Sequence, residues 1–206
     1  MAEIGLFPLE LVLLPTERIP LHIFEPRYKE LVAECLATGS EFGLVLAEDG
    51  AVHEIGTRAR VGEVLDVADD GRMNIVIEGG SRFRLLELTS GRSFQTGEIE
   101  PVGDEDDPPE TADAERALEL FRRLSELTEA EVEIPAPDSP ELSFELAARV
   151  DFGTAIKQEL LAMLSPRQRL ARLSELMQQA VEALVLETEL RERASKNGKV
   201  APLDPA

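Results

Sequence analysis

The sequence predicts an α+β protein in which a strand-rich first half is followed by a helical second half. Short apolar runs between turn residues fill positions 1–102, and apolar residues at helical spacing dominate from position 112 onward. An acidic, proline-rich stretch at 103–111 lies between them and is expected to be a solvated linker. We therefore predict a strand-rich part at 1–102, this linker, a helical part at 112–194 and a disordered tail at 195–206.

The first half contains a series of candidate strands. They are expected at 42–47, 61–67, 73–78, 81–88 and 94–99. Asp70-Gly71 is a favoured type I′ hairpin pair between the second and third strands, and Gly79-Gly80 is expected to end the third. Short strands with this punctuation favour a barrel or a sandwich over a parallel sheet.

One helix is predicted within the strand region. Pro26 suits its first turn, where a missing N–H has no cost, and Gly39 is a natural stop. Apolar residues follow one face at i, i+3, i+4, i+7 and i+8: Tyr28, Leu31, Val32, Cys35 and Leu36. The lone cysteine thus reads as a small buried residue.

The second half predicts four helical segments. They are 111–127, 140–150, 154–164 and a long last helix that begins at about 166 and continues past Leu190. Thr111 can cap the first segment, and residues 133–140 form a break after it. Ser165-Pro166-Arg167-Gln168 is a capping-box sequence with proline at the first helical position.

Charge is the strongest signal in the composition. The chain of 206 residues has 41 Asp and Glu against 21 Lys and Arg, a formal net charge of -20. Such a surface repels polyanions and anionic membranes, so nucleic acid and membranes are not expected partners. One cysteine excludes an internal disulfide, and neither a signal peptide nor a membrane span is evident. We therefore expect a cytoplasmic protein.

Motifs that carry catalytic chemistry are missing from the sequence. His22 and His53 lack a second His or Cys at metal-ligand spacing, so a zinc site is not expected. His53 falls in a polar loop and is expected to be exposed, and His22 alternates with its neighbours on a strand. The sequence contains no Walker A loop, no dinucleotide-binding glycine motif and no nucleophile elbow. We expect no enzyme activity, catalytic residue, metal or cofactor.

Two long motifs of the first half carry a family resemblance. The first consists of LFPL, VLLP and IPLHIFEPRY between Leu6 and Tyr28, and the second of GTRARV, DGR, IVIEG and RFRL between Gly56 and Leu85. In both, the chain resembles the N-terminal, substrate-binding domain of Lon-type proteases. Thr16 departs from the usual glycine, and a weaker likeness continues through 157–161 and 169–170.

The resemblance implies both a fold and a function. The fold would be a PUA-like pseudo-barrel with one inserted helix, followed by a helical bundle with a long last helix. The function would be a non-enzymatic protein- or peptide-binding module, acting as an adaptor or holdase for unfolded proteins in proteolysis or quality control. Its partners would be unfolded or exposed apolar segments and a Lon-type protease or other ATPase, with the oligomeric state left open.

Several motif residues are candidates for structural or binding roles. They are Pro20, His22, Phe24, Glu25, Arg27, Tyr28, Glu78 and Arg82. Phe24 is expected in the core, and Glu78 is expected to pair with Arg27 or Arg82. An exposed apolar patch is expected in the groove between barrel and helices.

Two alternative functions stay open on the sequence alone. PUA-like barrels often occur on RNA-modifying proteins, and a basic cluster could serve RNA binding if its members converge with Arg82. That cluster consists of Arg58, Arg60, Arg72 and Arg84. A hydrolase that uses clustered carboxylates ranks last, because it needs a cleft with a strongly perturbed carboxyl group.

Overall fold

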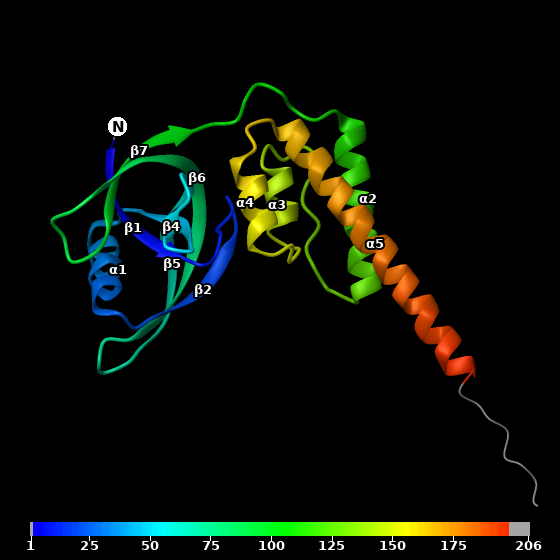
Figure 1. The fold of residues 1–206 in the computed structure, drawn as a ribbon, viewed down its shortest axis with the longest axis horizontal. Coiled ribbons are helices and arrows are strands. Elements are labelled where there is room, and N and C mark those ends of the chain that lie inside the picture. Colours follow the sequence, from blue (N-terminus) through cyan, green and yellow to red (C-terminus); the bar gives the residue numbers. More distant parts are fainter. Residues whose placement is uncertain (1, 198–206) are drawn as a thin grey trace, which may run out of the picture.

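A computed structural model describes residues 2–197 and has two parts, a strand-rich part and a helical part (Figure 1). Of the tail predicted at 195–206, residues 195–197 belong to the last helix, and the remainder lies outside the described residues. The predicted α+β class is confirmed, with strands in the first half and helices in the second.

Five strands close into a barrel. They are β1 (Ala2–Leu9), β3 (Phe42–Glu48), β5 (Ile55–Val67), β6 (Met73–Thr89) and β7 (Thr96–Val102). Their order is β1-β7-β6-β5-β3, and parallel pairing of β1 with β3 completes the ring. Of the two architectures that the sequence left open, the chain therefore adopts the barrel. The short strand β4 (Ala51–Val52) pairs with β3, and β2 (Arg18–Ile23) pairs with the first part of β6.

The prediction that Gly79-Gly80 ends a strand is wrong. β6 continues through both glycines and combines two of the predicted strands. A Cβ at Gly79 would lie 2.0 Å from the carbonyl oxygen of Leu14, so glycine permits a close approach of two backbone segments. The amide of Gly79 donates to Glu17, and its carbonyl accepts from Thr16, each at 2.9 Å.

The hairpin between β5 and β6 is confirmed, but its turn is not type I′. Only Gly71 has a positive φ, 77°, whereas type I′ needs two such residues. The Gly71 amide donates to Ala68, and the Ala68 amide donates to Arg72. This pattern is that of a three-residue loop in which the glycine takes the left-handed position.

Helix α1 (Pro26–Thr38) is the helix predicted within the strand region. Pro26 stands in its first turn, and Gly39 ends it in the left-handed conformation with φ 67°. Its apolar face packs into the barrel core, with Tyr28, Leu31, Val32 and Cys35 buried. The Tyr28 ring stacks on Phe7 with centroids 3.9 Å apart. Leu36, the last residue of the predicted stripe, is exposed instead.

Four helices form the second half. They are α2 (Thr111–Thr128), α3 (Leu142–Ala147), α4 (Thr154–Ala162) and α5 (Pro166–Asn197). Glu110 caps α2, one residue before the predicted Thr111, and Asp113 accepts a hydrogen bond from the Glu110 amide. Helix α3 is shorter than predicted, because residues 139–141 form turns before it begins. The Ser165 hydroxyl caps α5 as predicted, accepting from the Gln168 amide at 3.0 Å.

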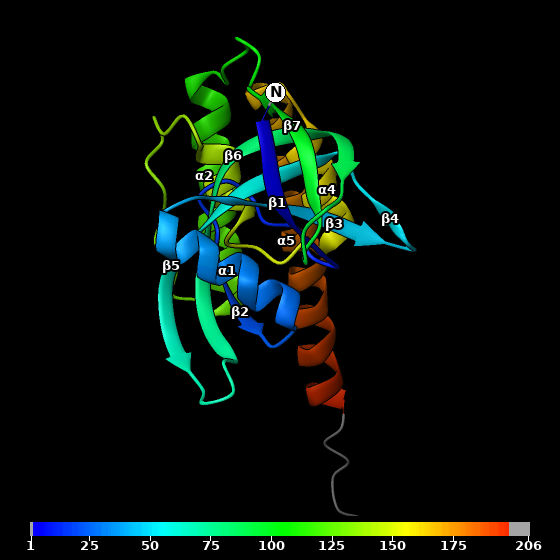
Figure 2. The ribbon, with the colours of Figure 1, turned by 90° about the vertical axis from the view of Figure 1, so that its left-hand side faces the viewer.

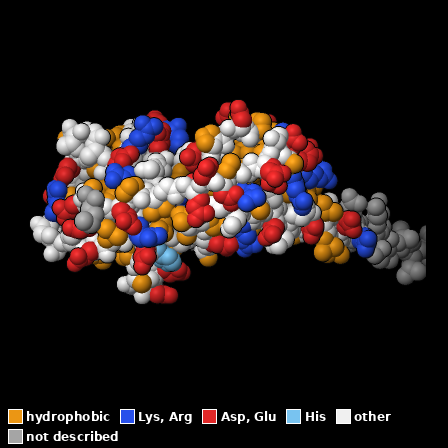
Figure 3. Space-filling view, turned by 90° about the horizontal axis from the view of Figure 1, so that it is seen from above, with side chains coloured by type: hydrophobic (Ala, Val, Ile, Leu, Met, Phe, Trp, Pro, Cys, Tyr) orange, Lys and Arg blue, Asp and Glu red, His pale blue; other side chains and the backbone are white. Residues whose placement is uncertain are grey.

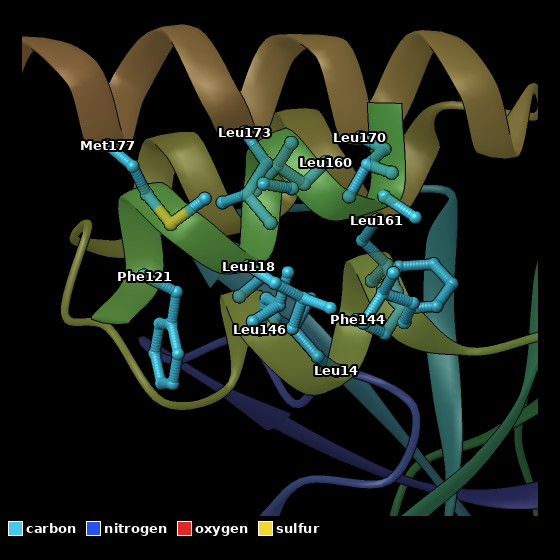
Figure 4. Packing of buried hydrophobic residues seen from close by; sticks show 14 of the residues in the cluster. Leu14, Leu118, Phe121, Phe144, Leu146, Leu160, Leu161, Leu170, Leu173 and Met177 are labelled. Carbon is cyan, nitrogen blue, oxygen red and sulfur yellow. The ribbon is translucent and has the colours of Figure 1, made fainter. Parts of the chain in front are cut away.

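The helices share a core with the strand-rich half. α5 packs along α2 and runs beyond its end (Figure 1). Between them and the barrel lie α3 and α4, whose apolar side chains meet those of α2 and α5 (Figure 4). Val12, Leu14 and Leu46 join the same cluster from the strand-rich half. Burial of these three side chains therefore fixes the helices against the barrel.

Replacement of Gly79 by alanine tests the close approach to Leu14. We expect Gly79→Ala to lower the free energy of unfolding by about 2 kcal/mol or more, because the clash is with backbone that cannot rotate away. Urea denaturation measures the change. Gly103→Ala is the matched control, since a Cβ there meets nothing within 4 Å. Equal stability of the two variants would contradict the interpretation.

Candidate binding surfaces

Arg169 of α5 is fully buried and lies at the centre of a charged cluster. Its Nη atoms donate to both carboxylate oxygens of Asp104, at 2.7 and 2.9 Å. Its Nε donates to the Ser143 hydroxyl at 2.8 Å, and its Nη1 also reaches the Met163 carbonyl. The guanidinium stands 3.7 Å from the centroid of the Phe144 ring. The donors of this buried cation are therefore directed at fixed oxygen acceptors, as a buried charge requires.

Arg82 of β6 joins the same cluster from the barrel. Its side chain is 3% exposed and pairs with Asp104, whose own side chain is 26% exposed. It also donates to the carbonyls of Leu161 and Met163, at 2.8 and 2.7 Å. Burial lowers the pKa of Arg82, and the neighbouring Asp104 opposes that shift. One carboxylate thus joins a barrel strand to the helical half.

Most residues of the predicted linker are exposed, and two of its acids also anchor it to the helical half. Asp104 holds the two buried arginines, and Asp107 accepts from the Ser165 hydroxyl at 2.6 Å and pairs with Arg167 at 2.7 Å. The Ser165 hydroxyl and Arg167 hold the pKa of Asp107 below its usual range. These contacts bring the linker against the start of α5.

A second ion pair holds α4 to the segment before β2. Lys157 pairs with Glu17 at 2.5 Å, and both side chains are largely buried. Glu17 also accepts from the Leu14 amide, and Gln158 donates to the Ile55 carbonyl at 3.1 Å. Residues 157–161, where the family likeness is weaker, therefore contact the barrel directly.

A groove of about 950 Å³ opens where the barrel, the linker and α3 meet. Arg82, Asp104 and Phe144 are among the residues that line it. Six prolines contribute to its walls: Pro15, Pro108, Pro109, Pro137, Pro140 and Pro166. A groove thus lies between barrel and helices, where the sequence predicted an exposed apolar patch, but none of the large apolar side chains that are exposed within residues 2–197 lines it.

Glu141, just before α3, lines this groove with a half-buried carboxylate. Burial raises its pKa, Asp104 raises it further, and Arg169 and Arg82 oppose the rise. Within residues 2–197 its carboxylate has neither a hydrogen-bond donor nor an ion-pair partner. Glu141, Asp104 and Arg169 are not identified as site residues from the sequence. For Arg169 a signal exists, because a charged residue stands there within the apolar stripe of α5.

The most exposed apolar side chains lie outside this groove, at the free end of the β2-β6-β5 ribbon and on α5, where Leu186 and Leu190 are 57% and 55% exposed. Phe24, Leu65 and Val67 are 58%, 54% and 58% exposed, and Val64 is also exposed. Strand register places Val67 opposite Met73, which in turn faces Ile23 next to Phe24. We call these four exposed residues, 24, 64, 65 and 67, the hairpin end. Figure 2 shows the β5–β6 hairpin reaching past α1.

The first family motif contributes Phe24 to the hairpin end and Pro15 to the groove. Phe24 is exposed and not part of the core, contrary to prediction. Its ring stacks on His22, with centroids 5.9 Å apart, and His22 bonds Asn74 through Nδ1 at 2.7 Å. Pro20 lies in β2 opposite Val76, on a strand that pairs only with β6 among the described strands.

The expected pairs with Glu78 do not form. Arg27 pairs with Glu25 at 2.9 Å and stands over the Tyr28 ring, and Arg82 pairs with Asp104. Glu78 instead contacts Arg18 and Arg60, its cross-strand neighbours on β2 and β5. Burial raises the pKa of Tyr28, which agrees with a role for this phenol in packing.

The predicted basic cluster does not form an uncompensated positive surface. Each of its arginines pairs with a carboxylate: Arg58 with Glu41, Arg60 with Glu78 (which Arg18 shares), Arg72 with Asp70 and Arg84 with Glu100. On the face seen in Figure 3, Lys and Arg side chains lie among Asp and Glu side chains. RNA binding therefore gains no support from these residues.

The comparisons with known proteins agree with this architecture. A profile of the ATP-dependent protease La (LON) substrate-binding domain matches residues 3–179. The chain belongs to this family. The match is to the substrate-binding domain and contains neither a protease nor an ATPase domain.

Curated relatives of this Lon-family chain are Lon proteases. That of Brucella suis biovar 1 (strain 1330) is 23% identical in an alignment 205 residues long, which covers 91% of this chain and 25% of the relative. That of Parabacteroides distasonis is 26% identical in an alignment 191 residues long, which covers 82% of this chain and 23% of the relative. The chain spans about a quarter of the length of these relatives.

Two solved structures resemble the chain. The Lon N-terminal domain protein from Xanthomonas campestris has a TM-score of 0.68 and 31% identity, over 84% of this chain and 97% of that one. The N-terminal domain of the Mycobacterium avium complex Lon protease has a TM-score of 0.72 and 17% identity, over 86% and 98%. The second likeness is one of fold alone. In residues 2–197, no helix is long and apolar enough to cross a membrane.

Removal of the charge on Asp104 tests the buried cluster. We expect Asp104→Asn to lower the free energy of unfolding by about 3 kcal/mol, because two buried guanidinium groups lose their only carboxylate among the described residues. Thermal or urea unfolding measures the change. Asp107→Asn in the same linker is expected to cost less, about 1 kcal/mol, because the side chain of its partner Arg167 is 51% exposed. The account fails if Asp107→Asn is the more damaging change.

Proposed function

We infer that this protein binds exposed apolar segments of other protein chains and catalyses no reaction itself. The hairpin end is the observation that carries this proposal. Four apolar side chains are exposed at this end of one ribbon, where they are free to contact apolar segments of a client chain. Membership of the Lon substrate-binding family supports the same role.

The fold explains why these side chains stay accessible. On β2 and β6, the side chains of Ile23 and Ile75 are buried in the barrel core. The ribbon extends beyond this core, so residues near the turn have no layer above them (Figure 2). A client chain that covers Phe24 or Leu65 would gain roughly 1.5–3 kcal/mol for each side chain removed from water.

The role in the cell follows as a further part of this proposal. The protein would act as an adaptor or a holdase for unfolded chains in proteolysis or quality control, with a Lon-type protease or another ATPase as partner. What supports this is that its relatives are Lon proteases and that its likeness covers their substrate-binding part. The single cysteine suits a reducing compartment, so we propose the cytoplasm.

Binding to unfolded clients is the direct test. We expect saturable binding of fluorescently labelled unfolded proteins of differing net charge, and no binding of the same proteins when folded. Phe24→Ser/Leu65→Ser/Val67→Ser should weaken binding at least about tenfold, because three apolar contacts are lost. Fluorescence anisotropy titration measures both results.

The control changes the same number of exposed apolar residues elsewhere. Leu86→Ser/Leu88→Ser/Leu186→Ser removes three exposed leucines outside the hairpin end. This variant should bind unfolded clients like the unchanged protein. Equal weakening by both triple variants would show that the hairpin end is not the binding surface. Absence of saturable binding to any unfolded client would refute the proposed function.

A further inference from the structure

The groove between barrel and helices differs in chemistry from the hairpin end. Its walls combine the six prolines with Phe144, Ala114 and Val102, so its surface offers apolar contacts. Proline has no backbone N–H, so these six residues add apolar surface to the walls without adding a backbone donor. A volume of about 950 Å³ is enough to hold several side chains of an extended segment.

The charges around this groove are almost all negative. Its lining contains six acids: Asp104, Glu105, Asp106, Glu110, Asp138 and Glu141. The single basic residue among the described lining residues is Arg82, which is buried and already bound to Asp104 and to two carbonyls. Asp104 is in turn occupied by the two arginines of the cluster. The remaining acids therefore give the groove an uncompensated negative charge.

Glu141 shows the consequence of this imbalance most directly. Its carboxylate is half-buried and lacks a partner within residues 2–197, although Arg82 and Arg169 lie close enough to influence it. A cation beside Glu141 would stabilise its charged form, whereas an anion would add to the repulsion. The groove therefore favours a ligand that brings positive charge together with apolar surface.

We propose that this groove binds an extended protein segment in which lysine or arginine alternates with proline or aliphatic residues. The aliphatic stems of lysine and arginine would lie against the prolines, and their charged ends would meet Glu105, Asp106 and Glu141. This inference rests on the proposed function, since the segment would belong to a client chain. It adds that the protein selects among clients by charge.

Short labelled peptides test the groove separately from the hairpin end. The probe is a peptide that alternates lysine with proline and leucine, and its matched probes carry glutamine or glutamate instead of lysine. We expect the lysine peptide to bind, the glutamine peptide to bind at least about tenfold more weakly, and the glutamate peptide not to bind. Equal affinity for the lysine and glutamate peptides would overturn the proposal.

Two triple variants with the same change in net charge locate the effect. Glu105→Gln/Asp106→Asn/Glu141→Gln neutralises the groove, and Glu87→Gln/Glu98→Gln/Glu115→Gln neutralises exposed acids outside it. The first should bind the lysine peptide at least about tenfold more weakly, and the second should bind it like the unchanged protein at moderate salt. Equal loss in both would mean that net charge alone matters and would contradict a site in the groove.

Failure of this inference differs from failure of the proposed function. If unfolded clients bind at the hairpin end but the groove variant binds the lysine peptide normally, only the groove inference is wrong. If the lysine peptide binds the groove while no unfolded client binds at all, the proposed function is wrong. The claim that the groove selects among clients by charge is then wrong as well.

Discussion

The carboxylate of Asp104 connects the barrel to the helices through ion pairs with two buried arginines. A buried guanidinium is tolerated only where its donors find acceptors, and Arg82 and Arg169 both meet this need at Asp104 and at the Met163 carbonyl. Because one arginine comes from β6 and the other from α5, the linker acid joins the two halves. Apolar packing around Leu14 adds buried apolar surface to this junction, and the hydrogen bonds of the charged cluster orient the two halves relative to each other.

The same cluster shapes the groove above it. Arg82, Asp104 and Phe144 form part of the groove lining, so the contacts that hold the helices also set the surface that a ligand would meet. The acids that the cluster leaves without partners give that surface its charge. The hairpin end lies apart from this arrangement, on strands that extend beyond the barrel core. The molecule therefore offers two surfaces of different chemistry, one apolar and one acidic with apolar walls.

Local features of this fold could be predicted from sequence, and long-range contacts could not. Pro26 and Gly39 mark the limits of α1 because their backbone preferences act locally. Gly79 was misread, because its flexibility is visible in the sequence whereas the Leu14 carbonyl that occupies the Cβ position is not. The sequence places Asp104 in a solvated linker, because its partners Arg82 and Arg169 come from elements that are distant along the chain. The motif residue Arg82 was identified as a candidate, but its position at the groove could come only from the fold.

The coupling between Asp104 and Arg169 tests this account most directly. Free energies of unfolding are measured by urea denaturation for Asp104→Asn, Arg169→Leu and the double variant. If the two side chains act as one unit, the double variant loses less stability than the sum of the single losses, by more than about 1 kcal/mol. Single losses that add to within about 0.5 kcal/mol would show that Asp104 and Arg169 do not act as one unit and would contradict the account.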